Sequence, residues 1–243
     1  MQNRSFEEKE PPKGHTAGGN RLRPAPVKNH LNDKVSNETY RWNDEYCPGW
    51  ALETKGPGKA VMELTKENPL HPATPNSLQI SIPKDAGEAS LINHGYVGMG
   101  LKGGEKYHLR LYLSTAGYNG EVLVHLLSST DKVLSEAPVQ IVKGAGWNEY
   151  RLDLVPDQSD TKAWLVLCFR DAGTVWADYV SLFPEKTFNI RPNGLRKDVA
   201  EFLAGLKPAF IRWPGGCIVE GITLCNRVEW KKTLGDPMTR SGE

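Results

Sequence analysis

Cysteine is scarce in this chain, with four residues among 243. Cys47 and Cys168 stand alone, and Cys217 and Cys225 are too far apart to form a C-x-x-C pair. Because histidine-rich spacing is also absent, the sequence supports neither a zinc site nor a disulfide framework. We therefore expect free thiols, most of them buried like small apolar side chains.

The chain also lacks an excess of charge of either sign. Its 30 Lys and Arg residues face 29 Asp and Glu residues, which gives a formal net charge of +1. This balance gives no electrostatic reason to expect nucleic acid or an anionic membrane as a partner. No apolar run approaches the ~18 residues of a membrane-spanning helix. A hydrophobic fraction of 39% is typical of a globular protein with a substantial core.

Short runs of alternating apolar and polar residues dominate the middle of the chain. Up to about residue 75, stretches rich in Pro and Gly indicate turns and loops, with VMELT (61–65) as one strand among them. The later runs are SLQISI, KYHLRLYLS, EVLVHLLSS, APVQIVK, NEYRLDL, KAWLVLCFR and VWADYVSLF. About seven or eight such strands without an intervening helix predict an antiparallel β-sandwich. We predict this sandwich, of the jelly-roll type, over residues 45–186, after an irregular segment at 1–44.

The pattern changes after Pro184. In NGLRKDVAEFLAGLKP the apolar residues recur at helical spacing, and Asn193 is a candidate N-cap. The run AFIRW (209–213) then predicts a short buried strand. A helix followed by a strand is one step of a parallel α/β architecture, in which a strand needs neighbours on both edges. Residues 187–243 are therefore predicted to be an incomplete part of an α/β barrel domain.

An abrupt turn follows the predicted strand. Pro214 ends the strand by removing a backbone donor, and Gly215 and Gly216 permit close approach of a ligand to the backbone. In parallel α/β folds, functional groups collect on the loops after the carboxyl ends of the strands. Arg212 lies at the end of the predicted strand, where its guanidinium can orient a carboxylate. The alternative is a tight surface turn with Arg212 in a structural ion pair.

The stretch IRWPGGCIVEG, followed by LCNRVEWKKTLGDPMTR, resembles the α-L-arabinofuranosidases of glycoside hydrolase family 51. The second barrel strand of these enzymes typically reads L-R-[FWY]-P-G-G-C, and the following loop resembles E-N-R-x-x-W-K-x-T-[IL]-G. Here Cys225 stands where Glu is common before Asn-Arg. The segment QNRSFE resembles the one after the first barrel strand, and bacterial members carry a carbohydrate-binding-like sandwich between these points.

This resemblance implies a retaining glycosidase that releases terminal arabinofuranose from arabinoxylan or arabinan. Two glutamates on later strands of a (β/α)8 TIM barrel carry out the reaction, with carboxyl groups about 5–5.5 Å apart. The first barrel strand would precede Met1, and both glutamates would follow Glu243. We therefore expect an enzyme fragment that holds neither catalytic residue and is inactive alone, and we assign Glu220 no catalytic role. The resemblance implies no required cofactor.

Four positions are carried over from the family motif. The resemblance assigns Gly216 and Cys217 to the arabinose subsite, Trp230 to the wall of the pocket, and Arg212 to the orientation of the catalytic carboxylates. Without the motif, Cys217 would be interpreted as a small buried side chain. For Trp230, a role in packing alone is the alternative to a place in the pocket wall. The expected partner is an arabinofuranose-containing polysaccharide or oligosaccharide.

The predicted sandwich has a functional interpretation of its own. Carbohydrate-binding modules of this shape stack exposed aromatic residues on sugars, and some hold a structural calcium ion. The candidates for stacking are Trp147, Trp164, Trp176, Tyr96 and Tyr118, of which Trp164 and Trp176 lie in apolar runs that favour the core. Asp178 is a candidate calcium ligand, with a plain surface carboxylate as the alternative. A non-catalytic carbohydrate-binding module is thus the alternative function.

The sequence leaves the compartment and the oligomeric state open. The first residues, MQNRSFEEKEPPKG, lack the apolar region of a signal peptide. This bears on export only if Met1 is the natural start. The resemblance is compatible with an extracellular or periplasmic parent enzyme and with a homo-oligomer.

Overall fold

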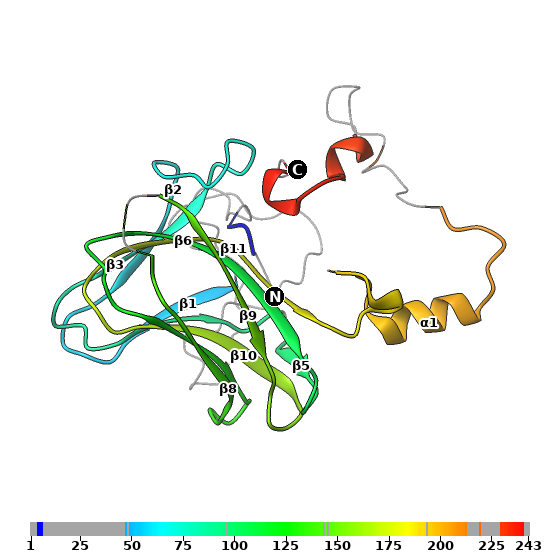
Figure 1. The fold of residues 1–243 in the computed structure, drawn as a ribbon, viewed down its shortest axis with the longest axis horizontal. Helices are drawn as coiled ribbons and strands as arrows, with labels where there is room; N and C mark the ends of the chain where they lie inside the picture. The colour runs from blue at the N-terminus through cyan, green and yellow to red at the C-terminus, as the bar shows by residue number, and fades with distance from the viewer. Residues whose placement is uncertain are drawn as a thin grey trace, which may run out of the picture.

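Two antiparallel β-sheets form the body of the described structure (Figure 1). The computed structural model describes residues 4–6, 47, 49–95, 97–142, 144, 146–192, 194–212, 219 and 229–240. In chain order the strands are β1 (Trp50–Thr54), β2 (Val61–Thr65), β3 (Ser77–Ile82), β4 (Ala89–Asn93), β5 (Met99–Leu101), β6 (Tyr107–Ala116), β7 (Val122–Leu127), β8 (Val133–Val139), β9 (Asn148–Leu154), β10 (Asp160–Phe169) and β11 (Gly173–Pro184). The predicted β-sandwich is confirmed.

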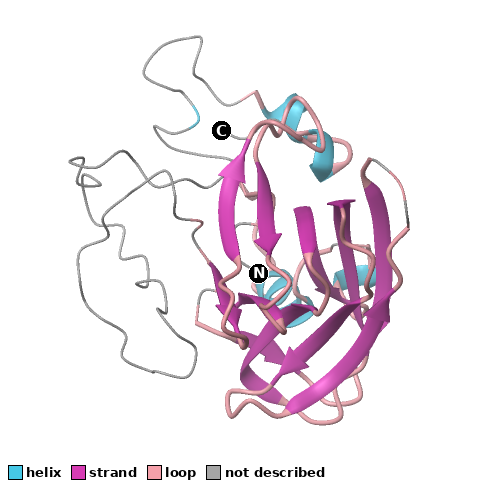
Figure 2. Ribbon diagram, turned by 90° about the vertical axis from the view of Figure 1, so that its left-hand side faces the viewer, coloured by secondary structure: helices cyan, strands magenta, loops and turns pink. Residues whose placement is uncertain are grey.

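Each sheet mixes strands from distant parts of the sequence. The first sheet has the order β1-β4-β10-β7-β8, with β5 also paired to β10, and the second has the order β2-β3-β11-β6-β9. The chain therefore crosses repeatedly between the two layers, which pack against each other in Figure 2.

The core between the sheets follows from the period-2 pattern. In β9, Leu154 is buried and Tyr150 and Leu152 pack against the core, while Glu149 and Arg151 alternate with them on the outer face. Successive side chains of a strand point to opposite faces, so alternation alone buries one face of the second sheet.

The first sheet is buried on both faces along β10. Leu165 and Leu167 point into the main core, whereas Trp164, Val166 and Cys168 belong to a second apolar cluster. Ile92 and Leu123 complete that cluster from the neighbouring strands β4 and β7. This is the reason for the nearly continuous apolar run in β10, because a strand covered on both faces loses its alternation.

Three strands were absent from the sequence-based expectation, namely β1, β4 and β5. All five residues of β4 are buried, so this strand shows no alternation, and β5 has only three residues. The predicted run at 137–143 is also wrong in its bounds, because β8 covers Val133–Val139. Val139 pairs with Val122, the first residue of β7, so the residues after Val139 have no partner strand there.

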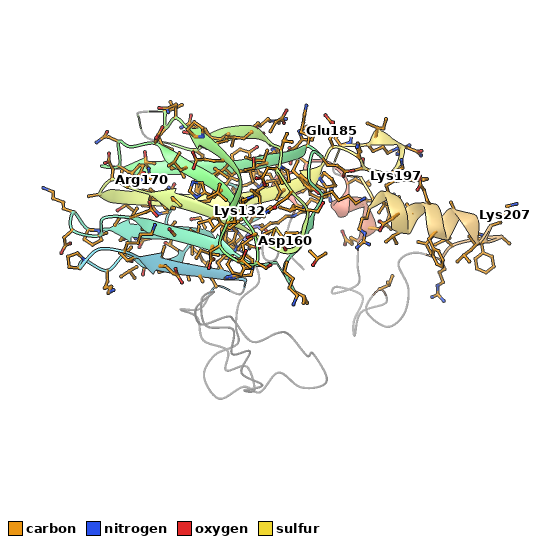
Figure 3. The ribbon with its side chains drawn as sticks, turned by 90° about the horizontal axis from the view of Figure 1, so that it is seen from below. Lys132, Asp160, Arg170, Glu185, Lys197 and Lys207 are labelled. Atoms are coloured by element: carbon orange, nitrogen blue, oxygen red, sulfur yellow. The ribbon has the colours of Figure 1, made fainter. Side chains whose placement is uncertain are left out.

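After the sandwich, the elements whose bounds the structure describes are a helix, α1 (Lys197–Gly205), and the short 3-10 helices η1 (Phe188–Ile190), η3 (Trp230–Thr233) and η4 (Pro237–Thr239). The predicted helix is thus confirmed, but its candidate N-cap is wrong, because α1 begins at Lys197 and Arg196 rather than Asn193 occupies the N-cap position. Within α1 only Ala200 is buried, and Figure 3 shows the helix extending away from the sheets. No helix in the described ranges is long and apolar enough to cross a membrane.

The predicted strand at 209–213 is wrong over 209–212, which form no strand, and Trp213 lies outside the described residues. Phe210 and Ile211 are instead 82% and 70% exposed. A strand needs a partner for its backbone donors and acceptors, and none of the described strands lies beside this segment. The incomplete barrel therefore stays a prediction.

Candidate functional site

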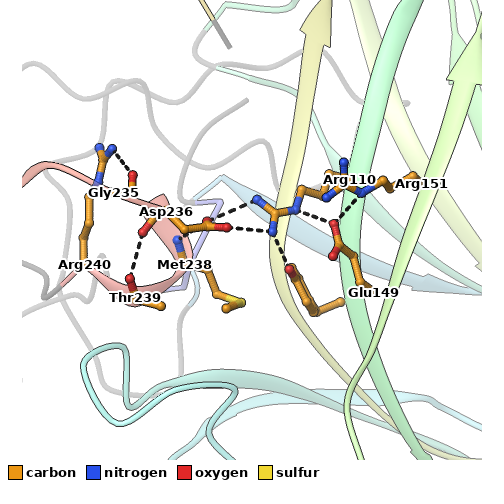
Figure 4. A network of polar contacts seen from close by, with 9 residues as sticks. Arg110, Glu149, Arg151, Gly235, Asp236, Met238, Thr239 and Arg240 are labelled. Atoms are coloured by element: carbon orange, nitrogen blue, oxygen red, sulfur yellow. Dashed lines mark hydrogen bonds and ion pairs between the residues drawn. The ribbon is translucent and has the colours of Figure 1, made fainter. Parts of the chain in front are cut away.

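A polar network on the outer face of the second sheet is centred on Arg110. In β6, Leu109 and Leu111 point into the core, so Arg110 between them points outward. Its Nη1 and Nη2 donate to Oδ1 and Oδ2 of Asp236 at 3.1 and 3.0 Å, and its Nε donates to Oε1 of Glu149 at 2.6 Å (Figure 4). The guanidinium thus joins a strand of the sandwich to the C-terminal part of the chain.

The charges of this network stabilise one another. Hydrogen bonds to Asp236, and then to Glu149, raise the pKa of Arg110 although partial burial opposes the shift. The bond from Arg110 is the main cause of the lowered pKa of Asp236, aided by the Met238 N–H. Burial raises the pKa of Glu149, but hydrogen bonds from Arg151 and Arg110 outweigh it, and the net shift is downward. All three groups therefore stay charged at neutral pH.

Aromatic rings hold the guanidinium from two sides. The Cζ atom of Arg110 lies 5.2 Å from the ring centroid of Tyr112 and 5.3 Å from that of Tyr179. The Cζ atom of Arg4 lies 5.3 Å from the centroid of the Tyr179 ring and 6.0 Å from that of the Phe183 ring. Such cation–π contacts restrict where the cation can move. The second sheet therefore presents Arg110 in a fixed position.

The backbone of Tyr179 explains how its ring reaches this position. Tyr179 has a φ of +43°, in the left-handed region that a tyrosine rarely adopts. The pairing of β11 with β6 shifts register between Asp178 and Ser181, which identifies a β-bulge. Bulges of this kind re-aim side chains, and here the centroid of the Tyr179 ring lies 5.3 Å from the Cζ atoms of both Arg4 and Arg110.

Asp236 also organises the segment in which it lies, residues 229–240, which we call the C-terminal segment. Its Oδ1 accepts a hydrogen bond from the Met238 N–H at 3.1 Å and so caps η4. The Arg240 side chain donates to the Gly235 carbonyl at 2.6 Å. A second anchor joins the segment to the loop between β2 and β3, where the Thr74 hydroxyl donates to the Met238 carbonyl at 3.3 Å.

Trp230 begins η3 in the same segment and is 55% exposed, with Nζ of Lys231 5.9 Å from its ring centroid. Arg212 is exposed and ends the described range 194–212. Gly216 and Cys217 lie outside the described residues. The structure therefore places Trp230 and Arg212 at the surface, and the roles of all four predicted site residues stay predictions.

Asp178, the predicted calcium ligand, is buried rather than at the surface, with 1% of its area exposed. The interpretation as a plain surface carboxylate is thus wrong. Its Oδ1 accepts the Tyr179 N–H at 2.6 Å, so this oxygen serves the backbone of the bulge. Across the described residues, no group of three or more His, Cys, Asp and Glu side chains could hold a metal ion. The role of Asp178 as a calcium ligand stays a prediction.

The candidate stacking residues separate into buried and accessible groups. Tyr118 is 2% and Trp164 is 9% exposed, so both are packed away from solvent. Trp176 is only half-buried and belongs to neither apolar cluster, so its expected place in the core is wrong. It lies on the outer face of the second sheet, and its Nε1 donates to Oε1 of Gln79 at 2.9 Å. Trp147 is half-buried and Tyr96 is outside the described residues.

A cavity of about 250 Å³ lies where the sandwich meets the chain leading to α1. It is lined by Arg4, Ser181, Leu182, Phe183, Pro184, Gly194 and Arg196. Arg196 is held by Asp198 through two hydrogen bonds of 2.7 Å, which lower the pKa of that carboxyl to about 2. The cavity is thus lined by two cationic side chains, Arg4 and Arg196, and Arg196 is already paired with the carboxylate of Asp198.

Known proteins resemble this chain in sequence. Residues 202–243 match the family model of the α-L-arabinofuranosidase 1 domain. α-L-Arabinofuranosidase 1 of Arabidopsis thaliana is 30% identical over 219 residues, which cover 86% of this chain and 32% of that protein. The extracellular exo-α-L-arabinofuranosidase of Streptomyces chartreusis is 30% identical over 217 residues, covering 83% of this chain and 25% of the relative.

A solved structure agrees with these relatives. The arabinose-bound α-L-arabinofuranosidase MgGH51 superposes with a TM-score of 0.72 at 30% identity, over 79% of this chain and 32% of that one. The chain thus spans about a third or less of the length of the proteins it matches. Over the residues that they share, this chain resembles the α-L-arabinofuranosidases of glycoside hydrolase family 51 in sequence and in fold, and the predicted resemblance is confirmed.

Proposed function

We propose that the protein containing these residues is a retaining α-L-arabinofuranosidase that releases terminal arabinofuranose from arabinoxylan or arabinan. The match of residues 202–243 to the arabinofuranosidase domain carries this proposal. That range includes Trp230 and Asp236, which the structure places in one ordered segment. The arabinose bound in the similar solved structure supports the choice of sugar.

In this proposal the residues of the chain bind and orient the sugar. The exposed indole of Trp230 offers an apolar face against which a sugar ring can pack. Gly216 and Cys217 contribute the arabinose subsite, and Arg212 orients a catalytic carboxylate through its two-pronged guanidinium. The two glutamates of the family would supply the nucleophile and the acid/base at a separation of about 5–5.5 Å.

The 243 residues alone are proposed to be inactive. Their described part consists of the sandwich, α1 and short 3-10 helices, and it forms no barrel that could hold two carboxylates at the required separation. The test is an assay of 4-nitrophenyl α-L-arabinofuranoside with the purified chain and with the full-length protein. We expect release of nitrophenol by the full-length protein only, and release by the chain above a blank preparation would contradict the proposal.

A second function is favoured by Trp176. The Gln79 side chain accepts a hydrogen bond from Nε1 of Trp176 and donates one to Oε1 of Glu63 at 3.0 Å. An aromatic ring and polar groups therefore share the outer face of β11, β3 and β2. Such a surface can bind a sugar by stacking and hydrogen bonds. The test is a calorimetric titration of the chain with arabino-oligosaccharides.

Two variants separate this surface from the pocket wall. Binding through the sandwich should be lost in Trp176→Ala and retained in Trp230→Ala. The opposite pattern would assign binding to the C-terminal segment, and no heat at millimolar ligand would exclude a sugar-binding sandwich.

A further inference from the structure

We propose that Arg110 of the sandwich is a positioning residue that holds the C-terminal segment and thereby fixes Trp230 for sugar binding. The clamp itself follows from the contacts of Arg110 and Asp236 described above. Its consequence for the sugar rests on the proposed function, in which Trp230 is part of the pocket. The sandwich would then contribute to the pocket without touching the substrate.

The Arg110–Asp236 pair differs from an ordinary surface ion pair. Exposed pairs contribute little, since two mobile side chains must be ordered. The Arg110 side chain is only 18% exposed and is already held by Glu149 and the two tyrosine rings. Both of its terminal nitrogens bond the two oxygens of one carboxylate, a geometry that fixes orientation as well as distance. Little further ordering is therefore needed on the side of Arg110.

Local bonds connect Asp236 to Trp230. The Leu234 N–H donates to the Lys231 carbonyl at 3.3 Å and closes η3. Gly235 has a φ of +95°, which glycine adopts without strain, and it turns the chain from η3 into η4. Asp236 then caps η4 through Met238. A displacement of Asp236 would therefore move η3, and Trp230 with it.

The clamp is tested by hydrogen–deuterium exchange of the peptide that covers residues 229–240 in the 243-residue chain. We expect Arg110→Gln and Asp236→Asn each to increase the exchange rate of this segment about tenfold. The double variant should match the single ones, because both substitutions remove one shared interaction.

The control is Arg151→Gln, since Arg151 bonds the same Oε1 of Glu149 at 2.6 Å and forms no hydrogen bond with Asp236 among the described contacts. Unchanged exchange in Asp236→Asn, a variant outside the sheets, would overturn the clamp.

The positioning role is tested by kinetics of the full-length protein on 4-nitrophenyl α-L-arabinofuranoside. Arg110→Gln should lower kcat/KM about tenfold, mainly through KM, while Arg110→Lys should recover part of the loss and Arg151→Gln should leave kcat/KM unchanged. Faster exchange with an unaltered kcat/KM would overturn the positioning role. If the unsubstituted protein does not hydrolyse the substrate, the proposed function fails, whereas the exchange data still decide the clamp.

Discussion

The carbonyl oxygen of Arg4 accepts a hydrogen bond of 2.8 Å from the N–H of Val180 in β11. This bond forms at the β-bulge, where the strand has lost its regular partner. Two residues on, Phe6 is fully buried in the main core, with its ring centroid 5.3 Å from that of Trp50. Residues 4–6, expected to be part of an irregular segment, therefore complete the sandwich.

This arrangement predicts a large loss of stability for Phe6→Ala. Truncation of a buried phenylalanine leaves a cavity and typically lowers the free energy of unfolding by about 3–5 kcal/mol. Phe210→Ala is the matched control, because Phe210 is 82% exposed and its truncation should change the value by less than about 0.5 kcal/mol. Urea denaturation followed by circular dichroism measures both. A loss below about 1 kcal/mol in Phe6→Ala would show that residues 4–6 do not belong to the core.

Glu88 joins the ends of three neighbouring strands in the first sheet. It precedes β4, and its carboxylate accepts bonds from Lys55, just after β1, and Arg170, just after β10, at 2.6 and 2.9 Å. Only 13% of its side chain is exposed. Burial raises the pKa of Glu88, but the bonds from Lys55 and Arg170 outweigh it and the net shift is downward.

Glu88→Gln should therefore lower the free energy of unfolding by about 1 kcal/mol at pH 7. Because the folded pKa lies below the ordinary value of about 4.3, the contribution is complete above that pH and is lost as the pH falls through the folded pKa. The difference between the two proteins should accordingly shrink as the pH falls below about 4.3. Asp157→Asn, which removes an exposed pair with Lys132, is the control. A difference that stays unchanged on acidification would indicate packing rather than charge.

Local patterns predicted the strands whose side chains alternate and missed those that do not. NEYRLDL matches β9 residue for residue, because a half-buried strand displays both of its faces in the sequence. The five buried residues of β4 display one face only, and a short apolar run has no period to read. AFIRW has the composition of a buried strand, yet composition does not provide the neighbouring strand that 209–212 would need.

The site was less predictable than the fold for the same reason. Alternation in HLRLYL places Arg110 on the outer face of β6, but nothing nearby in the sequence names its partner, which lies 126 residues later. The family motif identified Trp230 through its neighbours in the chain. It could not identify Arg110, since the link between them depends on the folded arrangement of two distant segments.

Two cysteines are predicted to be unreactive in the folded chain. Cys47 and Cys168 are buried, as expected from the sequence, and burial raises the pKa of the Cys168 thiol. Since the thiolate is the reactive form, iodoacetamide at pH 8 should modify both at least about tenfold more slowly than in urea. Mass spectrometry of the digested chain resolves each cysteine. Modification of Cys168 at the same rate in both conditions would contradict its burial between Ser90 and His125.

The clamp between Arg110 and Asp236 should open in acid. The pKa of Asp236 is lowered chiefly by the bond from Arg110, so its carboxylate contributes fully above its ordinary pKa of about 3.9 and loses that contribution as the pH falls through the folded value. Amide protection of Met238 and Thr239, corrected for intrinsic exchange, should therefore be constant from pH 7 to 5 and fall below about pH 4. In Asp236→Asn this amide protection should be low throughout.

The Leu111 amide, in the strand that carries Arg110, reports whether the sandwich itself is still folded. If Met238 and Leu111 lose protection together, the acid transition is unfolding of the sandwich rather than release of the C-terminal segment.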